Sequence, residues 1–188
     1  MKIKSILTIM MVILAGQLLR GQSTGNPVTD LLLSAYSERN YTTQLVTDQQ
    51  LDIILNCGIK APSSRNQQPW RFTVIKDEAA IKEIISDAVA GNVLIIISGA
   101  ESPAGTTPDF DCGLAAESMF VAAHGLGLGA RIYGSPVNNI NSKRDVYQVP
   151  AGFKAVIVLR VGNVGKPVDA VSSASPRKPF EEIVNFKK

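Results

Sequence analysis

Residues 61–72 read APSSRNQQPWRF and connect an expected helix to an expected strand. Prolines at positions 62 and 69 restrict the backbone of this loop, and its Ser, Asn and Gln side chains both donate and accept hydrogen bonds. Such a loop can present hydroxyls, an amide and main-chain groups to the edge of a flat heterocycle. A capped turn without a ligand explains the composition equally well, so the residues alone leave both interpretations open.

Two helices are expected before this loop. Asn26 followed by Pro27 is a helix start, because Asn caps free amides and Pro suits the first helical position, and this helix is expected over residues 27–37. Thr47 with Gln50 three residues later is a capping-box pattern. A second helix is therefore expected to begin there and to end before the loop.

The chain after the loop alternates between strand and helix patterns. Its periodicity predicts strand 71–75, helix 77–90, strand 93–98, helix 112–127, strand 155–161 and an extended tail over 166–179. Residues 93–98 are almost wholly apolar, which is typical of a strand that is buried on both faces. The chain is therefore expected to mix helices with a buried sheet.

The long helix carries little charge. Between residues 114 and 128 only Glu117 is surely charged, so the helix is expected to be buried nearly all round, in the centre of a large core or across a subunit interface. A domain this small has little room for a helix in the centre of a large core, which favours a position at a dimer interface. Gly125, Gly127 and Gly129 follow a helix rather than a strand, so they indicate a helix terminator and not a dinucleotide-binding fingerprint.

Bulk properties indicate one globular domain. A chain of 188 residues with 45% hydrophobic and 19% charged residues can bury a core without disulfide bonds. The net charge of +3 comes from scattered Lys and Arg without a basic stripe, which makes nucleic acid an unexpected partner. We assign residues 23–188 to this domain.

Residues 1–22 have the pattern of a secretory signal peptide. Lys2 and Lys4 precede an apolar run over 6–15, and small or polar residues follow, with candidate cleavage sites after Gly16 and Gly21. The run is shorter than the roughly 20 residues of a membrane span, although an uncleaved anchor is the alternative. The mature protein is expected to be exported, periplasmic or secreted, without stable membrane insertion.

Few residues are suited to side-chain catalysis or metal binding. His124 is the only histidine and lies inside the long helix, where a packed ring with one satisfied nitrogen is expected. Cys57 and Cys112 are interpreted as buried thiols, with a disulfide in an oxidising compartment as the alternative. One His and two distant Cys do not furnish a usual metal ligand set, and a Ser nucleophile lacks a His partner, so we assign no metal and no catalytic side chain.

Four motifs, in order between Leu31 and Val184, resemble the nitroreductase family. Members of that family share a helix that ends in Ala-Pro-Ser, then Asn, then Gln-Pro-Trp and a strand, which residues 61–72 match. The other three motifs are a Ser-x-Arg-x-aromatic element at Ser37, Arg39 and Tyr41, a central helix with Asp111, Gly113, Ala116 and Gly-Leu-Gly at 125–127, and a C-terminal element at 177–184.

The resemblance implies an α+β, nitroreductase-like three-layer fold with a central sheet flanked by helices, and a homodimer with FMN at each of two subunit interfaces. It implies phosphate binding by Ser37, Arg39 and Arg177. It implies that the partner subunit supplies Pro62, Ser63 and Ser64, that Asn66 and Gln68 address the flavin ring, and that Ile132, Tyr133 and Gly134 lie along the ring near its reactive nitrogen.

The chain departs from the family pattern at several positions. Ala35 and Ser175 stand where many relatives place basic residues, which predicts weaker phosphate binding. Tyr133 stands where some relatives carry an acidic residue, and the region between Ala90 and Val93 is too short for the helices that often cover the substrate pocket. The substrate therefore does not follow from the resemblance.

The expected reaction is ping-pong oxidoreduction, in which the bound flavin supplies the chemistry. NAD(P)H is one candidate electron donor, and the expected acceptor is a small molecule such as a nitroaromatic, a quinone or an enone. Export complicates the choice of donor, because NAD(P)H is scarce outside the cytoplasm. Two alternatives remain: a non-catalytic exported flavin-binding protein, and a flavin oxidase or dehydrogenase with another donor.

Overall fold

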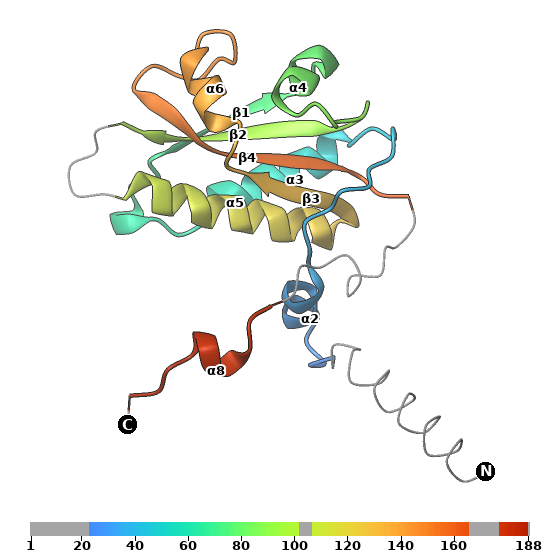
Figure 1. Cartoon of the computed structure of the whole chain (residues 1–188), viewed down its shortest axis with the longest axis vertical. Coiled ribbons are helices and arrows are strands. Elements are labelled where there is room, and N and C mark those ends of the chain that lie inside the picture. Colours follow the sequence, from blue (N-terminus) through green and yellow to red (C-terminus); the bar gives the residue numbers. More distant parts are fainter. Residues whose placement is uncertain (1–22, 102–106, 166–176, 188) are drawn as a thin grey trace, which may run out of the picture.

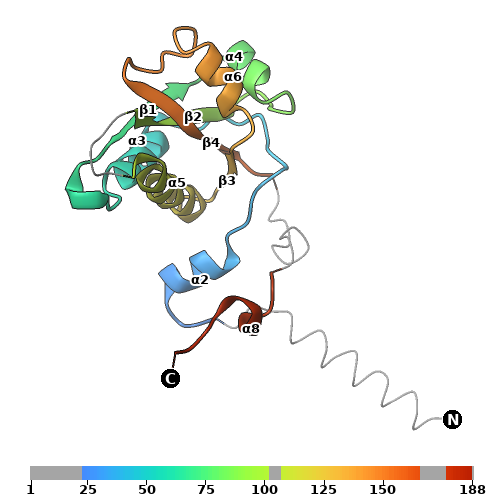
Figure 2. The ribbon, with the colours of Figure 1, turned by 60° about the vertical axis from the view of Figure 1, so that its left-hand side comes forward.

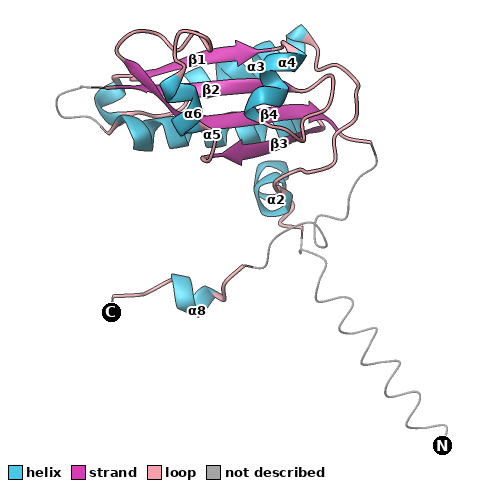
Figure 3. Cartoon of the chain, turned by 45° about the horizontal axis from the view of Figure 1, so that its top comes forward, coloured by secondary structure: helices cyan, strands magenta, loops and turns pink. Residues whose placement is uncertain are grey.

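A four-stranded antiparallel sheet forms the middle layer of the molecule. The computed structural model describes residues 23–101, 107–165 and 177–187; the expected signal peptide, Ser175 and most of the expected extended tail lie outside them. The strands lie in the order β1 (Trp70–Ile75), β2 (Val93–Ala100), β4 (Phe153–Asn163) and β3 (Leu128–Tyr133), as Figure 3 shows.

Helices cover both faces of this sheet. The face that carries α3 (Asp48–Ile59) and α5 (Pro108–Gly125) buries one apolar cluster, and the face that carries α4 (Glu78–Ile84) and α6 (Val137–Ser142) buries a second (Figure 1). The expected α+β arrangement of three layers is confirmed.

The central strand β2 shows why the sheet is buried on both faces. Its side chains alternate between the two clusters, with Ile95 and Ile97 facing α3 and α5, and Leu94 and Ile96 facing α4 and α6. All four side chains have no exposed surface, and each gains about 2 kcal/mol from burial. The apolar run is therefore buried on both faces, as the sequence predicted.

Several element boundaries differ from the sequence prediction. Helix α2 (Pro27–Ser34) ends before residue 37, because the main-chain N–H of Glu38 instead bonds to Ala130 of β3 at 2.9 Å. Helix α4 ends at Ile84, since Ile85 becomes extended and packs into the core. Strand β3 and helix α6 had not been predicted. The glycine string does end α5, and Gly127 adopts the left-handed φ of 75° that suits a residue after a helix.

Helix α5 is buried on one side only within a single chain. Ala115, Met119 and Ala123 face the core, whereas Leu114 and Val121 on another side remain half-buried. The expectation of a helix buried all round is therefore not met by one chain alone. The half-buried side is the part of α5 that another surface can still cover.

The two terminal helices stand away from the sheet. Figures 1 and 2 show α2 and the short α8 (Phe180–Ile183) on the same side of the domain as α5 and at a distance from the strands. Their apolar side chains are largely exposed, including Leu33 at 70% and Phe180 at 60%. No helix among the described residues is long and apolar enough to cross a membrane.

Candidate functional site

The loop between α3 and β1 is strained and largely exposed. It contains one short 3-10 turn, η1 (Ser64–Asn66), and left-handed φ angles of 52° at Arg65, 54° at Asn66 and 49° at Gln68. Each such residue costs on the order of 1 kcal/mol or more unless its surroundings enforce it. The Ser63 hydroxyl accepts a hydrogen bond from the Gln68 main-chain N–H at 3.0 Å, which is one such constraint.

A second constraint comes from Asp111 in the first turn of α5. This side chain is fully buried, and its Oδ1 accepts a hydrogen bond from the Ser64 main-chain N–H at 3.1 Å. The dipole of α5 also favours a negative charge at this end of the helix. Asp111 therefore ties the strained loop to the core across 47 positions of sequence.

Loss of this tie is expected to expose the loop to protease. Asp111→Ala removes a hydrogen bond to a charged group, worth about 1.5–3 kcal/mol, so the opened loop should become roughly tenfold to a hundredfold more populated. Trypsin cleavage after exposed Arg65 should accelerate by a similar factor. Asp111→Asn, which keeps an acceptor oxygen, should stay near the wild-type rate.

The matched control for this experiment is Asp109→Ala. Asp109 lies in the same turn, but its side chain is 61% exposed and pairs with Lys154 at the surface. If both alanine variants are cleaved at the wild-type rate, Asp111 does not restrain the loop.

The segment after α2 places the first expected phosphate residues along the sheet edge. Residues 36–38 run beside β3, and the side chains of Ser37 and Arg39 are exposed whereas Glu38 between them is buried. This alternation is typical of extended chain, in which neighbouring side chains point to opposite sides. Ser37 and Arg39 therefore point away from the sheet together.

The end of β3 presents a partly open surface next to this segment. Ile132 is 37% exposed, Gly134 is exposed, and an added Cβ at Gly134 would meet no atom within 4 Å. The Tyr133 ring is held from within the chain, since the Arg160 guanidinium lies 3.4 Å from its hydroxyl and that of Arg131 lies over its ring. Arg177 lies just before α8 and is exposed.

One chain places the expected site residues in two separate groups, and Arg177, which precedes α8, belongs to neither. The loop group (residues 62–68) lies beside β1 and the start of α5, and the edge group (Ser37, Arg39 and residues 132–134) lies beside β3 on the opposite edge of the sheet. Three strand spacings separate these edges by about 14 Å. The neighbours of the two groups on α5, Asp111 and His124, lie about 20 Å apart along the helix axis.

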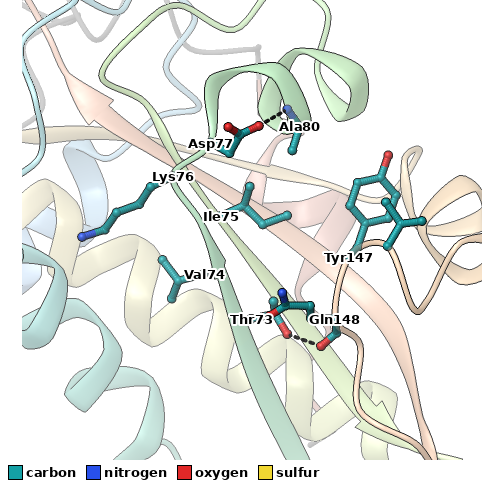
Figure 4. Close-up of a pocket in the computed structure, with 9 residues that line it drawn as sticks. Thr73, Val74, Ile75, Lys76, Asp77, Ala80, Tyr147 and Gln148 are labelled. Carbon is teal, nitrogen blue, oxygen red and sulfur yellow. Dashed lines mark hydrogen bonds between the residues drawn. The ribbon is translucent and has the colours of Figure 1, made fainter.

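Two hollows lie near β1, and one of them borders the loop group. A broad hollow of about 770 Å³ between α3 and the loop is lined by Asn66 and Gln68 together with Cys57 and Lys60. Figure 4 shows a smaller hollow of about 220 Å³ between β1, α4 and residues 146–148, where the Thr73 hydroxyl donates to the Gln148 carbonyl at 3.2 Å. No expected site residue lines the second hollow, so it is not our candidate.

Cys112 is buried and His124 is half-buried against aromatic rings, whereas Cys57 is half-buried and lines the hollow beside the loop, so the expected burial of both thiols holds for Cys112 alone. His124 contacts the rings of Phe120 and Tyr36, and burial lowers its pKa, which keeps the imidazole neutral; its Nε2 has no hydrogen bond within the described residues. Burial raises the pKa of Cys112 to about 12, so this thiol is unreactive. Cys57 and Cys112 are both free, and the described residues hold no cluster of metal-binding side chains.

Sequence reasoning missed two buried carboxylates that hold these segments. Glu38 was not singled out and Asp111 was noted only as part of a motif, yet Glu38 accepts hydrogen bonds from the main-chain amides of Arg39 and Asn40, and Asp111 accepts one from that of Ser64. The available signal was a charged residue inside an otherwise apolar or extended pattern, because a buried charge needs partners.

Comparisons with known proteins agree with this architecture. Residues 32–104 match the model of the nitroreductase family. A protein of Archaeoglobus fulgidus, named as an NADH dehydrogenase/NAD(P)H nitroreductase, is 27% identical over 150 residues, which cover 74% of this chain and 84% of the relative. A similarly named protein of Methanothermobacter thermautotrophicus is 27% identical over 58% of this chain and 62% of its own length.

Solved structures of similar fold include proteins with bound flavin. A nitroreductase from Desulfovibrio desulfuricans in complex with FMN superimposes with a TM-score of 0.72 at 26% identity and covers 87% of this chain and 98% of its own. A nitroreductase with bound FMN from Bacteroides fragilis has a TM-score of 0.71 at 18% identity, over 87% of this chain and all of its own, and supports the fold alone.

Proposed function

We propose that this chain, which is a nitroreductase-like protein by its sequence and its fold, is an FMN-dependent oxidoreductase that passes electrons from a donor to a small acceptor. One observation carries the proposal: the polar, strained loop and the edge group are the two surfaces that the family resemblance assigns to flavin. The donor is NAD(P)H, and acceptors are nitroaromatics, quinones or enones.

The residues present are compatible with FMN. Arg39 and Ser37 are exposed on one edge, and guanidinium is well suited to phosphate because its planar fork donates paired hydrogen bonds. Gly134 leaves room for a flat group to approach the main chain, since a Cβ there would touch nothing. Ala35 contributes no charge to the segment, so Arg39 and Arg177 carry most of the phosphate binding.

The site is completed by a second copy of the chain. The loop group and the edge group lie too far apart to contact one small ring within a single chain, and a homodimer brings the loop of one protomer to the edge of its partner. Exposed apolar side chains on α2 and α8, and the half-buried side of α5, supply the apolar area that such an interface requires.

The chain's own residues bind and orient in this mechanism. FMN, when bound, supplies the two-electron chemistry. Ser37, Arg39 and Arg177 hold the phosphate, while Asn66 offers a donor and an acceptor to the ring edge and Gln68 supports it through its bonds to Asn66. Residues 132–134 would lie along the ring near its reactive nitrogen, and the proposed ping-pong course requires no side-chain acid or base.

An exported, non-catalytic flavin-binding protein is the second candidate. The signal pattern at residues 1–22 supports this candidate, because it predicts export to the periplasm or outside the cell, where NAD(P)H is scarce. Ala35 carries no charge, which favours a site with fewer phosphate contacts. The chain turns tightly at Gly91, with a φ of 82°, which favours a pocket without inserted helices that cover it.

An absorbance spectrum of the purified protein, followed by anaerobic addition of NADH or NADPH, tests the proposal. Bleaching of bound flavin that is reversed by a nitroaromatic or a quinone supports the reductase. Flavin that stays yellow with both donors supports the carrier, and recovery only with O₂ supports an oxidase. Absence of flavin after incubation with FMN contradicts all three functions.

A further inference from the structure

Glu38 is a buried carboxylate between the two exposed residues that we assign to phosphate. Its side chain is 1% exposed. Oε1 accepts hydrogen bonds from the main-chain N–H groups of Arg39 at 2.8 Å and Asn40 at 2.6 Å, and Oε2 accepts one from the Tyr36 hydroxyl at 2.8 Å. The carboxylate therefore holds the backbone at Arg39 and Asn40 and the side chain of Tyr36, which lies just before Ser37.

Gly129 of β3 leaves space for the Glu38 side chain. A Cβ added at Gly129 of β3 would lie 2.5 Å from Glu38 Cγ and 2.6 Å from Val164 Cγ1, so only glycine permits Glu38 to pack against the strand. Within the described residues, no Lys or Arg forms an ion pair with Glu38. Three donors within residues 36–40, two main-chain N–H groups and one hydroxyl, stabilise the buried carboxylate.

We propose that Glu38 is a positioning residue for phosphate recognition, which holds the segment extended so that Ser37 and Arg39 face the FMN phosphate together. This inference rests on the proposed function. Glu38 does not touch the ligand in this arrangement, because its side chain points to the opposite side of the segment. Its effect on binding is therefore specific to the phosphate half of the cofactor.

Comparison of FMN with riboflavin isolates that half. In Glu38→Ala, loss of hydrogen bonds to a charged group is expected to weaken FMN binding about tenfold or more, while riboflavin binding changes less than about twofold. Glu38→Gln keeps an oxygen that accepts from both amides and should restore most of the FMN affinity. Gly129→Ala, which displaces Glu38, should reproduce the alanine phenotype. Affinities are measured by quenching of flavin fluorescence.

Amide hydrogen exchange of the flavin-free chain provides a readout that is independent of the ligand. The Arg39 and Asn40 amides should exchange faster in Glu38→Ala than in the wild type. If Glu38→Ala does not fold, the Tyr36→Phe variant tests the same role of Glu38. Tyr36→Phe should lower FMN affinity by a smaller factor than Glu38→Ala and leave riboflavin unaffected.

The outcomes separate the two proposals. Equal losses of FMN and riboflavin affinity in Glu38→Ala, or unchanged FMN affinity in all of these variants, overturn the positioning role and leave the flavin function standing. A wild-type chain that binds neither flavin overturns the proposed function, and the positioning role falls with it. A wild-type chain that prefers FMN, with the preference lost only on substitution at Glu38 or Gly129, supports both.

Discussion

A 1:1 mixture of Arg39→Ala and Asn66→Asp chains is expected to bind FMN although neither variant binds it alone at the same concentration. Arg39 belongs to the edge group and Asn66 to the loop group, which lie on opposite edges of one sheet. If each site takes its edge from one protomer and its loop from the other, a mixed dimer carries one doubly damaged site and one intact site.

The expected recovery is quantitative. Random exchange of subunits makes half of the dimers mixed, so about a quarter of all sites should be intact. Asp is the chosen substitution at position 66 because it tolerates the left-handed φ of 54°, whereas Ala would add backbone strain to the loss of the amide. Asp also removes the amide donor that Asn66 is proposed to offer to the ring edge, because an ionised carboxylate only accepts hydrogen bonds.

The matched control mixes Arg39→Ala with Ser37→Ala. Both substitutions lie in the edge group, so every dimer retains a damaged edge at each site and no recovery is expected. Bound FMN is counted by absorbance after gel filtration. Recovery in neither mixture, from chains that fold and form dimers, contradicts a site shared between two protomers.

The strongest sequence signals predicted the fold because they depend on local chemistry. Thr47 and Gln50 form the predicted capping box, and the apolar run from Val93 supplies the central strand. Helix α6 was missed because its six residues, VNNINS, carry one fully buried apolar side chain and no periodic stripe. Strand β3 was missed because Gly129 and Arg131 interrupt its β-rich pattern.

The candidate site could be predicted only as a set of residues and not as an arrangement. The family resemblance selected the loop group and the edge group, but their separation depends on strand order, which periodicity does not encode. The left-handed angles at Arg65, Asn66 and Gln68 also escape sequence reasoning, because one of the two hydrogen bonds that restrain this loop comes from Asp111, 47 positions away from Ser64. Whether all of these residues contact flavin stays a prediction.

The sequence did not predict a role for Arg160, because this residue lies inside a strand whose other residues are mostly apolar. It is 1% exposed, and its guanidinium donates to Asn92 Oδ1 at 2.8 Å and to the Asp87 carbonyl and carboxylate at 3.1 Å each. The same group lies 4.2 Å from the centre of the Tyr41 ring. One buried cation therefore joins β4 to the turn before β2 and to the segment that follows Arg39.

Among the buried polar residues, substitution of Arg160 is expected to lower the free energy of unfolding most. The Arg160→Lys variant should lose more stability than Arg160→Met. Met removes the charge and one of the two hydrogen bonds that Asn92 Oδ1 accepts, the other coming from the Val89 main-chain N–H at 3.2 Å, and this loss costs about 1–3 kcal/mol. Lys retains a buried charge but lacks the planar fork that reaches Asn92 and Asp87 together, so about 3 kcal/mol or more should be lost. Urea unfolding measures both.

Arg131→Met is the control, because Arg131 lies directly opposite Arg160 on β3, is only half-buried and stacks on Tyr133. Its replacement should cost less than about 1 kcal/mol, in the range of an exposed cation–π contact. If Arg160→Lys unfolds at the wild-type urea concentration, the donor geometry of the guanidinium is not what stabilises this junction. If Arg160→Met is less stable than Arg160→Lys, the positive charge contributes more to stability than the planar geometry of the guanidinium. The expectation that a buried Lys charge is the more costly of the two would then be wrong.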